Sequence, residues 1–492
     1  MKRPKFVNRF FELSLLLAFA ACGGGSGSPP PQPQHAAIRT LAYVDTECHE
    51  DGQSFSASQR LQVVRGDAAP VTVADIPTYG QLRPFGLCPI FGANGDGNIS
   101  VYAAALQRLG VSPDGSGVVY EVTLQNSLLA ALGVPDPLTQ EQEGIFYVRA
   151  DGTGLRRLGV PSREPAQRLV GLPPTPIAMW SNPIFWFSPN GRAVVFTDRG
   201  PGPGCEAAPQ AVVMDVETGE RTQVTHLPDA APDQSALAAP TIDFTLFVND
   251  TRIGYESRVN PNGLNPDGQR RIFEENTDST GFTAIPPPVV AAAGGMIVPH
   301  FFITSSVRFF DANPVSFPTP PVNPSPYWNT TSEVFVTAPD RTLQLTDFHR
   351  GDTGGNVVTD GQRVFFVASA NPFGTNPSEN CQIFSISVLG EDLRQLTQFR
   401  AADHSAIGCA TVTQQPGCII YLYELWLDPQ TGTLIFPSTC DPLGTNPNGK
   451  QYFAMRTDGT GLRQLTATRG AVTADDGSVD VEFPGPFGYD GF

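Results

Sequence analysis

Residues 187–196 read Phe187-Ser188-Pro189-Asn190-Gly191-Arg192-Ala193-Val194-Val195-Phe196, a tight-turn phrase followed by a run of strand-forming residues. Pro presets φ, Gly supplies positive φ, and Val and Phe favour extended backbone. The same phrase and strand recur at Val111–Tyr120 and Val358–Val367, and weaker copies stand at 248–255 and 472–481. Recurrence of one phrase along a chain predicts a repeat architecture.

A second phrase accompanies the first and consists of a strand, a polar turn and a short strand. Its fullest copies are Asp151-Gly152-Thr153-Gly154-Leu155-Arg156-Arg157-Leu158 and Asp458-Gly459-Thr460-Gly461-Leu462-Arg463-Gln464-Leu465-Thr466, and shorter copies end at Thr225, Thr346 and Thr397. Each unit then holds four short β segments. One such sheet cannot bury its own faces, so the units must stack, and closing them into a ring protects their edges. The sequence predicts an all-β chain that forms a single β-propeller.

The two phrases divide the chain into seven units, at residues 38–80, 99–162, 184–229, 242–286, 297–354, 356–403 and 409–470. The tail 472–483 begins another unit and then stops. We expect this tail to complete the first unit beside Leu41–Val44 and Arg60–Val64. The prediction is about seven four-stranded blades closed by both termini, with six or eight as alternatives.

The Ser-Pro-Asp-Gly phrase at 112–115 and the Asp-Gly-x-Gly-Leu-Arg-x-Leu-Thr phrase at 458–466 resemble the propeller repeats of the TolB family. The resemblance extends from about residue 99 to the C-terminus and implies a propeller. TolB also carries an N-terminal α/β domain, for which we expect no counterpart in this sequence. The resemblance therefore implies the architecture and not the role of TolB.

The first residues resemble an export signal. Four basic residues between Lys2 and Arg9 precede the apolar run Leu13–Ala21, which is the order of a secretory signal. Phe19-Ala20-Ala21-Cys22 resembles the processing site of a bacterial lipoprotein, and cleavage of a plain secretory signal after an Ala is the alternative. Gly, Ser, Pro and Gln follow, a composition typical of flexible linkers. We predict a signal peptide at 1–21, a lipid-attached linker at 22–37 and the propeller at 38–492.

The formal net charge of −17 excludes two classes of partner. Nucleic-acid binding needs a positive surface, and so does electrostatic adhesion to anionic lipid. We therefore expect membrane attachment only through a lipid on Cys22. The expected location is the bacterial cell envelope, at the outer membrane, facing the periplasm or the cell surface.

Cysteine usage fits an oxidising compartment. Seven cysteines follow Cys22, which predicts disulfides with one thiol left over. Cys409 and Cys418 flank the turn 414–417, so we predict a local bridge between them. No Cys-x-x-Cys or Cys/His spacing typical of zinc is present, and no metal site is expected.

The segment Gly92–Ser100 resembles a calcium loop. Gly92 stands at its first ligand position and Ala103 at its twelfth, where a calcium site needs carboxylates. We therefore interpret this segment as a turn.

The sequence contains no recognisable catalytic site. A Gly-x-Ser-x-Gly elbow is absent, and the histidines His49, His226, His300, His349 and His404 are scattered along the chain. No catalytic residues and no cofactor are predicted. The arginines that recur at one repeat position are interpreted as packing between blades, and three aromatic residues at and just before the start of the third unit as core. These are Arg156, Arg394, Arg463, Trp180, Trp186 and Phe187.

Three similar loops indicate where a partner binds. Residues 260–269, 371–377 and 441–450 are copies of one Asn-Pro phrase between the second and third strands of their units, so they should share one face. The fifth unit carries a longer insertion there, 313–329, and its Phe317, Tyr327 and Trp328 are predicted to form a binding loop. These features favour a non-catalytic scaffold that binds an envelope protein or peptide. The alternative is a propeller enzyme, such as a lyase, lactonase or hydrolase, with a carboxylate or metal site in the central pore.

Replacing Cys22 by Ser removes the thiol that lipid attachment requires, so we expect Cys22→Ser to move from the membrane to the soluble fraction. Fractionation of cells followed by immunoblotting measures the distribution, with Ser26→Ala in the same linker as the control. A Cys22→Ser protein that stays with membranes as strongly as the wild type would contradict the anchor.

Overall fold

Contacts divide the chain into two units, residues 1–34 and residues 35–492. The computed structural model describes segments of the second unit. The described residues are 35–50, 55–76, 106–122, 141–160, 185–198, 210–227, 242–257, 263–266, 271–284, 295–298, 301–309, 330–338, 341–348, 353–377, 381–400, 420, 425–428, 430–446, 450–476 and 478–489. All regular elements among them are strands. No helix in this part of the chain has the length and apolar character that a membrane crossing needs.

Both ends of the described chain build one five-stranded sheet, which we call the terminal sheet. Its strand order is β28-β29-β1-β2-β3. The strands are β1 (Thr40–Glu50), β2 (Phe55–Arg65), β3 (Val71–Ile76), β28 (Gly470–Thr473) and β29 (Val479–Tyr489). β1 pairs antiparallel with β29 from Leu41 opposite Tyr489 to Glu50 opposite Val479. The predicted closure of the first unit by the C-terminal tail is therefore confirmed.

Six further sheets each have four consecutive antiparallel strands. The first consists of β4 (Leu106–Val111), β5 (Gly117–Val122), β6 (Gly144–Arg149) and β7 (Arg156–Gly159). The second consists of β8 (Trp186–Phe187), β9 (Ala193–Asp198), β10 (Gln210–Asp215) and β11 (Arg221–Gln223). The third consists of β12 (Ile242–Asn249), β13 (Arg252–Ser257), β14 (Arg271–Asn276) and β15 (Thr283–Ala284). Each falls inside one of the predicted units.

The other three sheets follow the same plan. The fourth consists of β16 (Gly295–Val298), β17 (Phe301–Phe309), β18 (Thr330–Ala338) and β19 (Arg341–Gln344). The fifth consists of β20 (Thr353–Thr359), β21 (Arg363–Ala368), β22 (Gln382–Ser387) and β23 (Arg394–Gln395). The sixth consists of β24 (Trp426–Asp428), β25 (Thr433–Ser438), β26 (Gln451–Arg456) and β27 (Arg463–Gln464). Six sheets, and not seven, thus have four strands. The prediction of seven four-stranded blades is therefore wrong, and the alternative of six is the number found, because the terminal sheet takes two strands from the C-terminus and has five.

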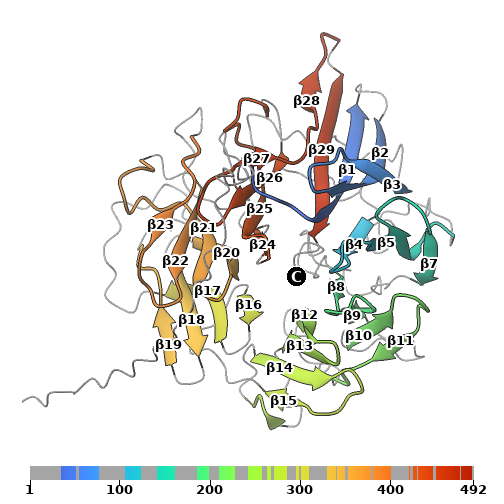
Figure 1. Cartoon of the computed structure of the whole chain (residues 1–492), viewed down its shortest axis with the longest axis vertical. Coiled ribbons are helices and arrows are strands. Elements are labelled where there is room, and N and C mark those ends of the chain that lie inside the picture. Colours follow the sequence, from blue (N-terminus) through green and yellow to red (C-terminus); the bar gives the residue numbers. More distant parts are fainter. Residues whose placement is uncertain are drawn as a thin grey trace, which may run out of the picture. The chain divides into compact units, whose positions relative to one another are not determined.

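The sheets surround a common centre, and the first strand of each four-stranded sheet lies nearest to it (Figure 1). Neighbouring sheets share apolar cores. One core joins Ala42 and Leu61 of the terminal sheet to Tyr120 of β5, and another joins Phe365 of β21 to Phe453 of β26. Burial of both faces of each sheet by its neighbours is what holds a propeller together. The chain is an all-β β-propeller.

The Ser-Pro-Asp-Gly turns are built as the sequence predicts. The Ser112 hydroxyl donates to Asp114 Oδ1 at 2.6 Å and accepts from the Gly117 N–H at 2.9 Å, while Gly115 has φ +67°. Ser188 and Asn190 repeat this arrangement, with the Ser188 hydroxyl 2.8 Å from Asn190 Oδ1. Side-chain hydrogen bonds of this kind fix a tight turn between two strands.

Strand direction sorts the connections onto two faces. Because the strands of each sheet alternate in direction, the connection between its second and third strands emerges opposite to its two tight turns. We call these the loop face and the turn face. The Asn-Pro loops lie where predicted, between β13 and β14, between β21 and β22, and between β25 and β26. They therefore share the loop face.

Truncation after Gly470 removes β29 and leaves the edge of β1 unpaired and its apolar neighbours open to water. We expect the free energy of unfolding to fall by more than about 4 kcal/mol, beyond most single substitutions. Thermal unfolding followed by circular dichroism measures the loss, and truncation after Tyr489 is the control. Cooperative melting at an unchanged temperature after removal of β29 would show that closure is not needed.

Candidate functional site

A repeated set of hydrogen bonds, which we call the lock, holds the loop-face edge of four sheets together. In the sheet of β20–β23, Gln382 accepts hydrogen bonds from the Thr397 hydroxyl at 2.7 Å and the Phe399 N–H at 3.0 Å. Its amide donates to the Phe399 carbonyl at 2.7 Å. Corresponding buried groups in three other sheets are Gln210 with Thr225, Glu333 with Thr346, and Gln451 with Thr466. The lock explains why Thr recurs in the second phrase, and in these four sheets it fixes the start of the link to the next sheet on the loop face.

The Asn-Pro loops share one internal architecture. The buried Asn376 donates its backbone N–H to Asn371 Oδ1 at 2.7 Å and its side-chain amide to the Ala370 carbonyl at 3.0 Å. In the next loop, Asn446 makes the same two bonds to Asp441 Oδ1 and the Cys440 carbonyl, at 2.7 and 3.0 Å. Two loops in different sheets are thus folded by identical contacts.

Further contacts pin these loops to their sheets. The Thr375 hydroxyl donates to Gln395 Oε1 at 2.8 Å, and the Thr445 hydroxyl donates to Gln464 Oε1 at 2.7 Å. Gly374 and Gly444 have φ of +72° and +70°, a backbone conformation that residues other than glycine rarely adopt. The described part of the first loop, 263–266, has Gly263 at +74° and a fully buried Asn265. The loops are therefore preorganised by the fold.

Each of these rigid loops exposes a large apolar side chain. Leu264, Phe373 and Leu443 are 44%, 49% and 44% exposed. Their neighbours Asn265, Asn376 and Asn446 are buried, so the loop points its polar residue inward and its apolar residue outward. Water-exposed apolar side chains on an ordered loop are typical of contact surfaces.

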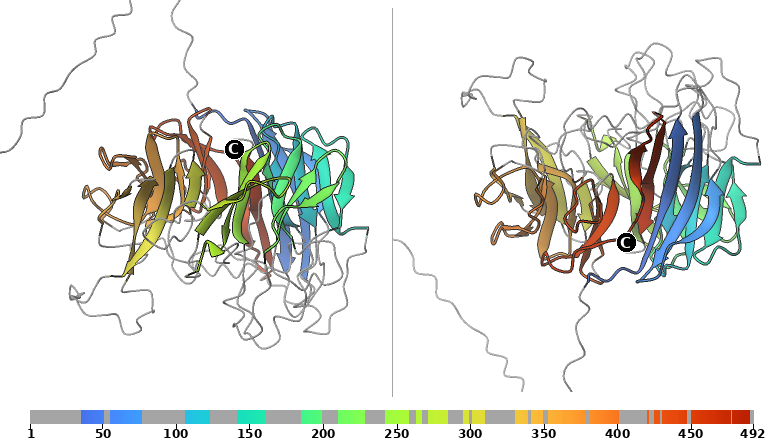
Figure 2. Two further views of the ribbon diagram at one scale, coloured as in Figure 1. Left: turned by 90° about the horizontal axis from the view of Figure 1, so that it is seen from below. Right: turned by 90° about the horizontal axis from the view of Figure 1, so that it is seen from above.

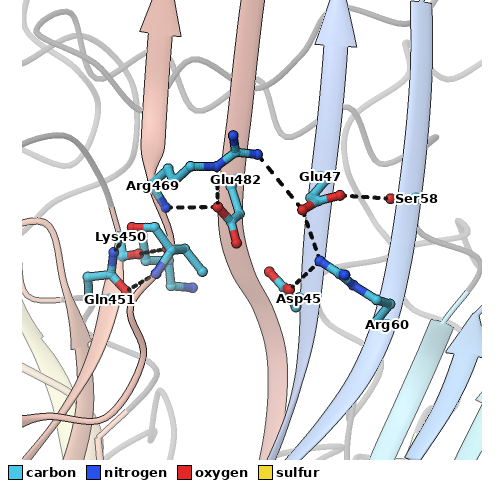
Figure 3. Close-up of polar contacts among 9 residues, drawn as sticks. Asp45, Glu47, Ser58, Arg60, Lys450, Gln451, Arg469 and Glu482 are labelled. Atoms are coloured by element: carbon cyan, nitrogen blue, oxygen red, sulfur yellow. Dashed lines mark hydrogen bonds and ion pairs between the residues drawn. The ribbon is translucent and has the colours of Figure 1, made fainter. Parts of the chain in front are cut away.

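A charged cluster lies on the terminal sheet at the loop-face end of the neighbouring β26 (Figure 3). We define it as Asp45 and Glu47 of β1, Arg60 of β2, Arg469, and Glu482 of β29. One Arg60 nitrogen lies 3.0 Å from Asp45 Oδ2 and 2.9 Å from Glu47 Oε1. Arg469 lies 2.8 Å from Glu482 Oε2 and 3.8 Å from Glu47 Oε1. Strand pairing brings these charges together, because Glu47 stands directly opposite Glu482.

Asp45 is the buried member of the charged cluster. Its side chain is 9% exposed, and its Oδ1 atom is fully buried with no hydrogen-bond partner. Burial, reinforced by the charge of Glu482, raises the pKa of Asp45 above its usual range, although Arg60 opposes this shift. The same environment raises the pKa of Tyr43, which precedes Asp45 on the same face of β1. The folded protein therefore disfavours the charged form of Asp45.

Several residues predicted as sites lie outside the described residues. They are Cys22, the pair Cys409 and Cys418, the insertion with Phe317, Tyr327 and Trp328, and the segment Gly92–Ser100. Among the described cysteines, Cys48 and Cys440 are disulfide-bonded and Cys381 is a buried free thiol. No group of three or more His, Cys, Asp or Glu side chains in the described segments is arranged to hold a metal ion.

Two of the histidines named in the sequence analysis lie among the described residues, and they have separate partners. His49 Nδ1 lies 2.7 Å from Asp480 Oδ1, and His226 Nδ1 lies 3.1 Å from the Gln223 amide. His300, His349, His404 and Trp180 lie outside the described residues.

The packing interpretation of the recurring arginines is confirmed where they reach the next sheet. Arg156 lies 4.5 Å from the Tyr147 ring centroid and donates to the Val216 carbonyl at 3.0 Å, and Arg463 pairs with Asp67 of the terminal sheet. Arg394 instead pairs at 2.5 Å with Asp392 of its own sheet. Trp186 packs in the core, with its ring 6.1 Å from that of Trp426, and Phe187 packs against a buried cluster.

Comparison of the sequence with protein-family models and with curated proteins finds no match. Solved structures with a similar fold include the β-propeller domain of the Trilobed protease from Pyrococcus furiosus, at 10% identity and TM-score 0.40, covering 76% of this chain and 89% of that one. TolB from Acinetobacter baumannii matches at 11% and 0.33, covering 92% and 66%. Oligogalacturonate lyase from Vibrio parahaemolyticus matches at 8% and 0.37, covering 60% and 67%. These values are low, so the fold assignment rests on the strand pairing.

Asp45→Asn should stabilise the fold at neutral pH. Because the folded-state pKa of Asp45 is raised, its charge opposes folding above that pKa, and protonation removes the penalty as the pH falls through it. We expect Asp45→Asn to melt at a higher temperature than the wild type at pH 7, with the difference shrinking on acidification. Calorimetry at several pH values measures it, and Asp75→Asn, an exposed change in the same sheet, is the control. A lower melting temperature at pH 7 would refute the assignment.

Proposed function

We propose that the chain is a non-catalytic, exported envelope lipoprotein whose propeller binds a protein or peptide through the loop face. One observation carries the proposal. Three Asn-Pro loops, two of them folded by the same hydrogen bonds, each present an exposed apolar side chain: Leu264, Phe373 and Leu443.

Rigidity distinguishes these three side chains from ordinary exposed apolar residues. Single exposed Leu or Val residues are normal on protein surfaces, and the turn face has them too, at Leu155 and Leu389. The Asn-Pro loops, however, are longer than a hairpin between six-residue strands requires. Their internal hydrogen bonds set the apolar tips before any partner arrives, so less conformational entropy is lost on binding. This arrangement supports recognition.

The proposed lipid anchor would place the binding surface at a membrane. A lipid on Cys22 and the linker 22–37 would hold the propeller at the envelope membrane while leaving it free to reorient. The expected partner is therefore a protein or peptide of the same compartment.

The alternative enzyme reading has one observation in its favour. Asp45, Glu47 and Glu482 converge, and convergent carboxylates are a common feature of catalytic sites. Arg60 and Arg469 are ion-paired to all three carboxylates. Guanidinium groups held against carboxylates favour electrostatic recognition over acid–base chemistry, so the scaffold remains our proposal.

The triple variant Leu264→Ser, Phe373→Ser and Leu443→Ser should fold normally and lose its partner. Removing three apolar anchors at about 1 kcal/mol each weakens binding on the order of a hundredfold. Affinity capture from detergent-solubilised envelope with the intact lipidated protein measures recovery.

The matched control is Leu155→Ser, Val248→Ser and Leu389→Ser, three exposed changes on the turn face. Equal recovery of every partner by the loop-face variant and the wild type would overturn the proposal.

A further inference from the structure

The charged cluster adjoins one of the Asn-Pro loops. Gln451, the first residue of β26 after the Asn-Pro loop 441–450, donates to the Thr468 carbonyl at 2.7 Å and accepts from the Thr468 N–H at 3.2 Å. Arg469 follows Thr468, and its backbone N–H donates to Glu482 Oε2 at 3.1 Å. Figure 3 shows Lys450 and Gln451 next to Arg469 and Glu482. A segment bound on the loop face would therefore pass within reach of the charged cluster.

The terminal sheet rises beside this loop. β1, β2 and β29 have eleven residues each, whereas the second and third strands of the adjacent sheet have six. In Figure 2 the blue and dark red strands of the terminal sheet are the longest of the molecule. Tyr43, Asp45 and Glu47 are every second residue of β1 and therefore lie on one face of the strand. Tyr43 packs in the core that it shares with Tyr452 of β26. The carboxylates stand beyond that core on the same face.

Charge in the cluster is not balanced. Three carboxylates, of Asp45, Glu47 and Glu482, face two guanidinium groups, of Arg60 and Arg469. Asp45 Oδ1 is buried, aimed into the cluster, and has no hydrogen-bond partner. An additional cation at this position would be attracted to the excess negative charge.

One of the two arginines is replaceable. The Arg469 side chain is 66% exposed, and it lies 3.8 Å from Glu47, the longest ion-pair distance in the cluster. Exposed pairs of this kind contribute little to stability, about 0–1 kcal/mol. An incoming ammonium or guanidinium group can therefore displace Arg469 from Glu47 with little loss of stability. Arg60 continues to pair with Asp45.

We propose that the charged cluster is the subsite that receives a Lys or Arg side chain of the segment bound on the loop face. This inference rests on the proposed function and adds the chemistry of the partner: an extended segment with apolar residues for the loop tips and a cationic residue for Glu47 and Glu482. The net charge of −17 complements such a partner and speeds its encounter.

The burial of Asp45 fits this role. Folding favours the protonated form of Asp45, because burial and the charge of Glu482 raise the pKa of this carboxylate. A bound cation would offset both effects, because its positive charge stabilises the carboxylate. Retention of a destabilising charge is typical of sites used for function.

The test begins with a selection of peptides. The intact exported protein is used to select from a phage-displayed library of random dodecapeptides, and the dissociation constant of the most enriched peptide is measured by calorimetry. We expect the enriched sequences to combine apolar residues with Lys or Arg. Replacing that cationic residue by Gln, or changing Glu47→Gln in the protein, should each weaken binding by about threefold to tenfold.

The two changes should not add, because each removes the same contact. Glu217→Gln, an exposed change on the turn face, is the control and should bind like the wild type.

The outcomes separate this inference from the proposed function. Enriched peptides that lack cationic residues, or that bind Glu47→Gln as tightly as wild type, would overturn the cation subsite and leave the loop-face scaffold intact. A selection that enriches no peptide would overturn both. A melting temperature for Glu47→Gln equal to wild type shows that any loss of binding is not a loss of folding.

Discussion

The antiparallel pairing of β1 with β29 is the contact on which the rest of the propeller depends. It joins residues more than four hundred positions apart in sequence, from Leu41 opposite Tyr489 to Glu50 opposite Val479. Closing so long a loop is entropically unfavourable, and the buried apolar faces of the terminal sheet compensate for it. The ring then covers both faces of each sheet, and the loops acquire fixed positions on it.

The same pairing creates the charged cluster. Glu482 faces Glu47 only because β29 lies in this register against β1, and a slip of one residue would turn every side chain of β29 to the other face. The C-terminal strand therefore both seals the ring and supplies one carboxylate of the cluster. Closure and recognition depend on one strand.

The sequence predicts the six four-stranded sheets well, because each tight turn encodes its own geometry within a few residues. Ser112, Asp114 and Gly115 determine one turn among themselves, and the Gln–Thr lock spans fewer than twenty positions. The tail was expected to complete the first unit as one blade of four strands, and the weak copy of the first phrase at 472–481 did not show that it adds two strands, β28 and β29. The charged cluster was also missed. Alternating charges at Asp45 and Glu47 were its only local signal, and its partners come from the far end of the chain.

The central claim is that the loop face contacts a partner while the turn face does not. Incorporation of a photoreactive benzoylphenylalanine at position 373 or at position 389, followed by irradiation of intact cells, tests it most directly. Both positions are exposed on β20–β23 connections, one on each face. The account predicts a cross-linked product from position 373 and none from position 389. Cross-linking from position 389 with none from position 373 would contradict it.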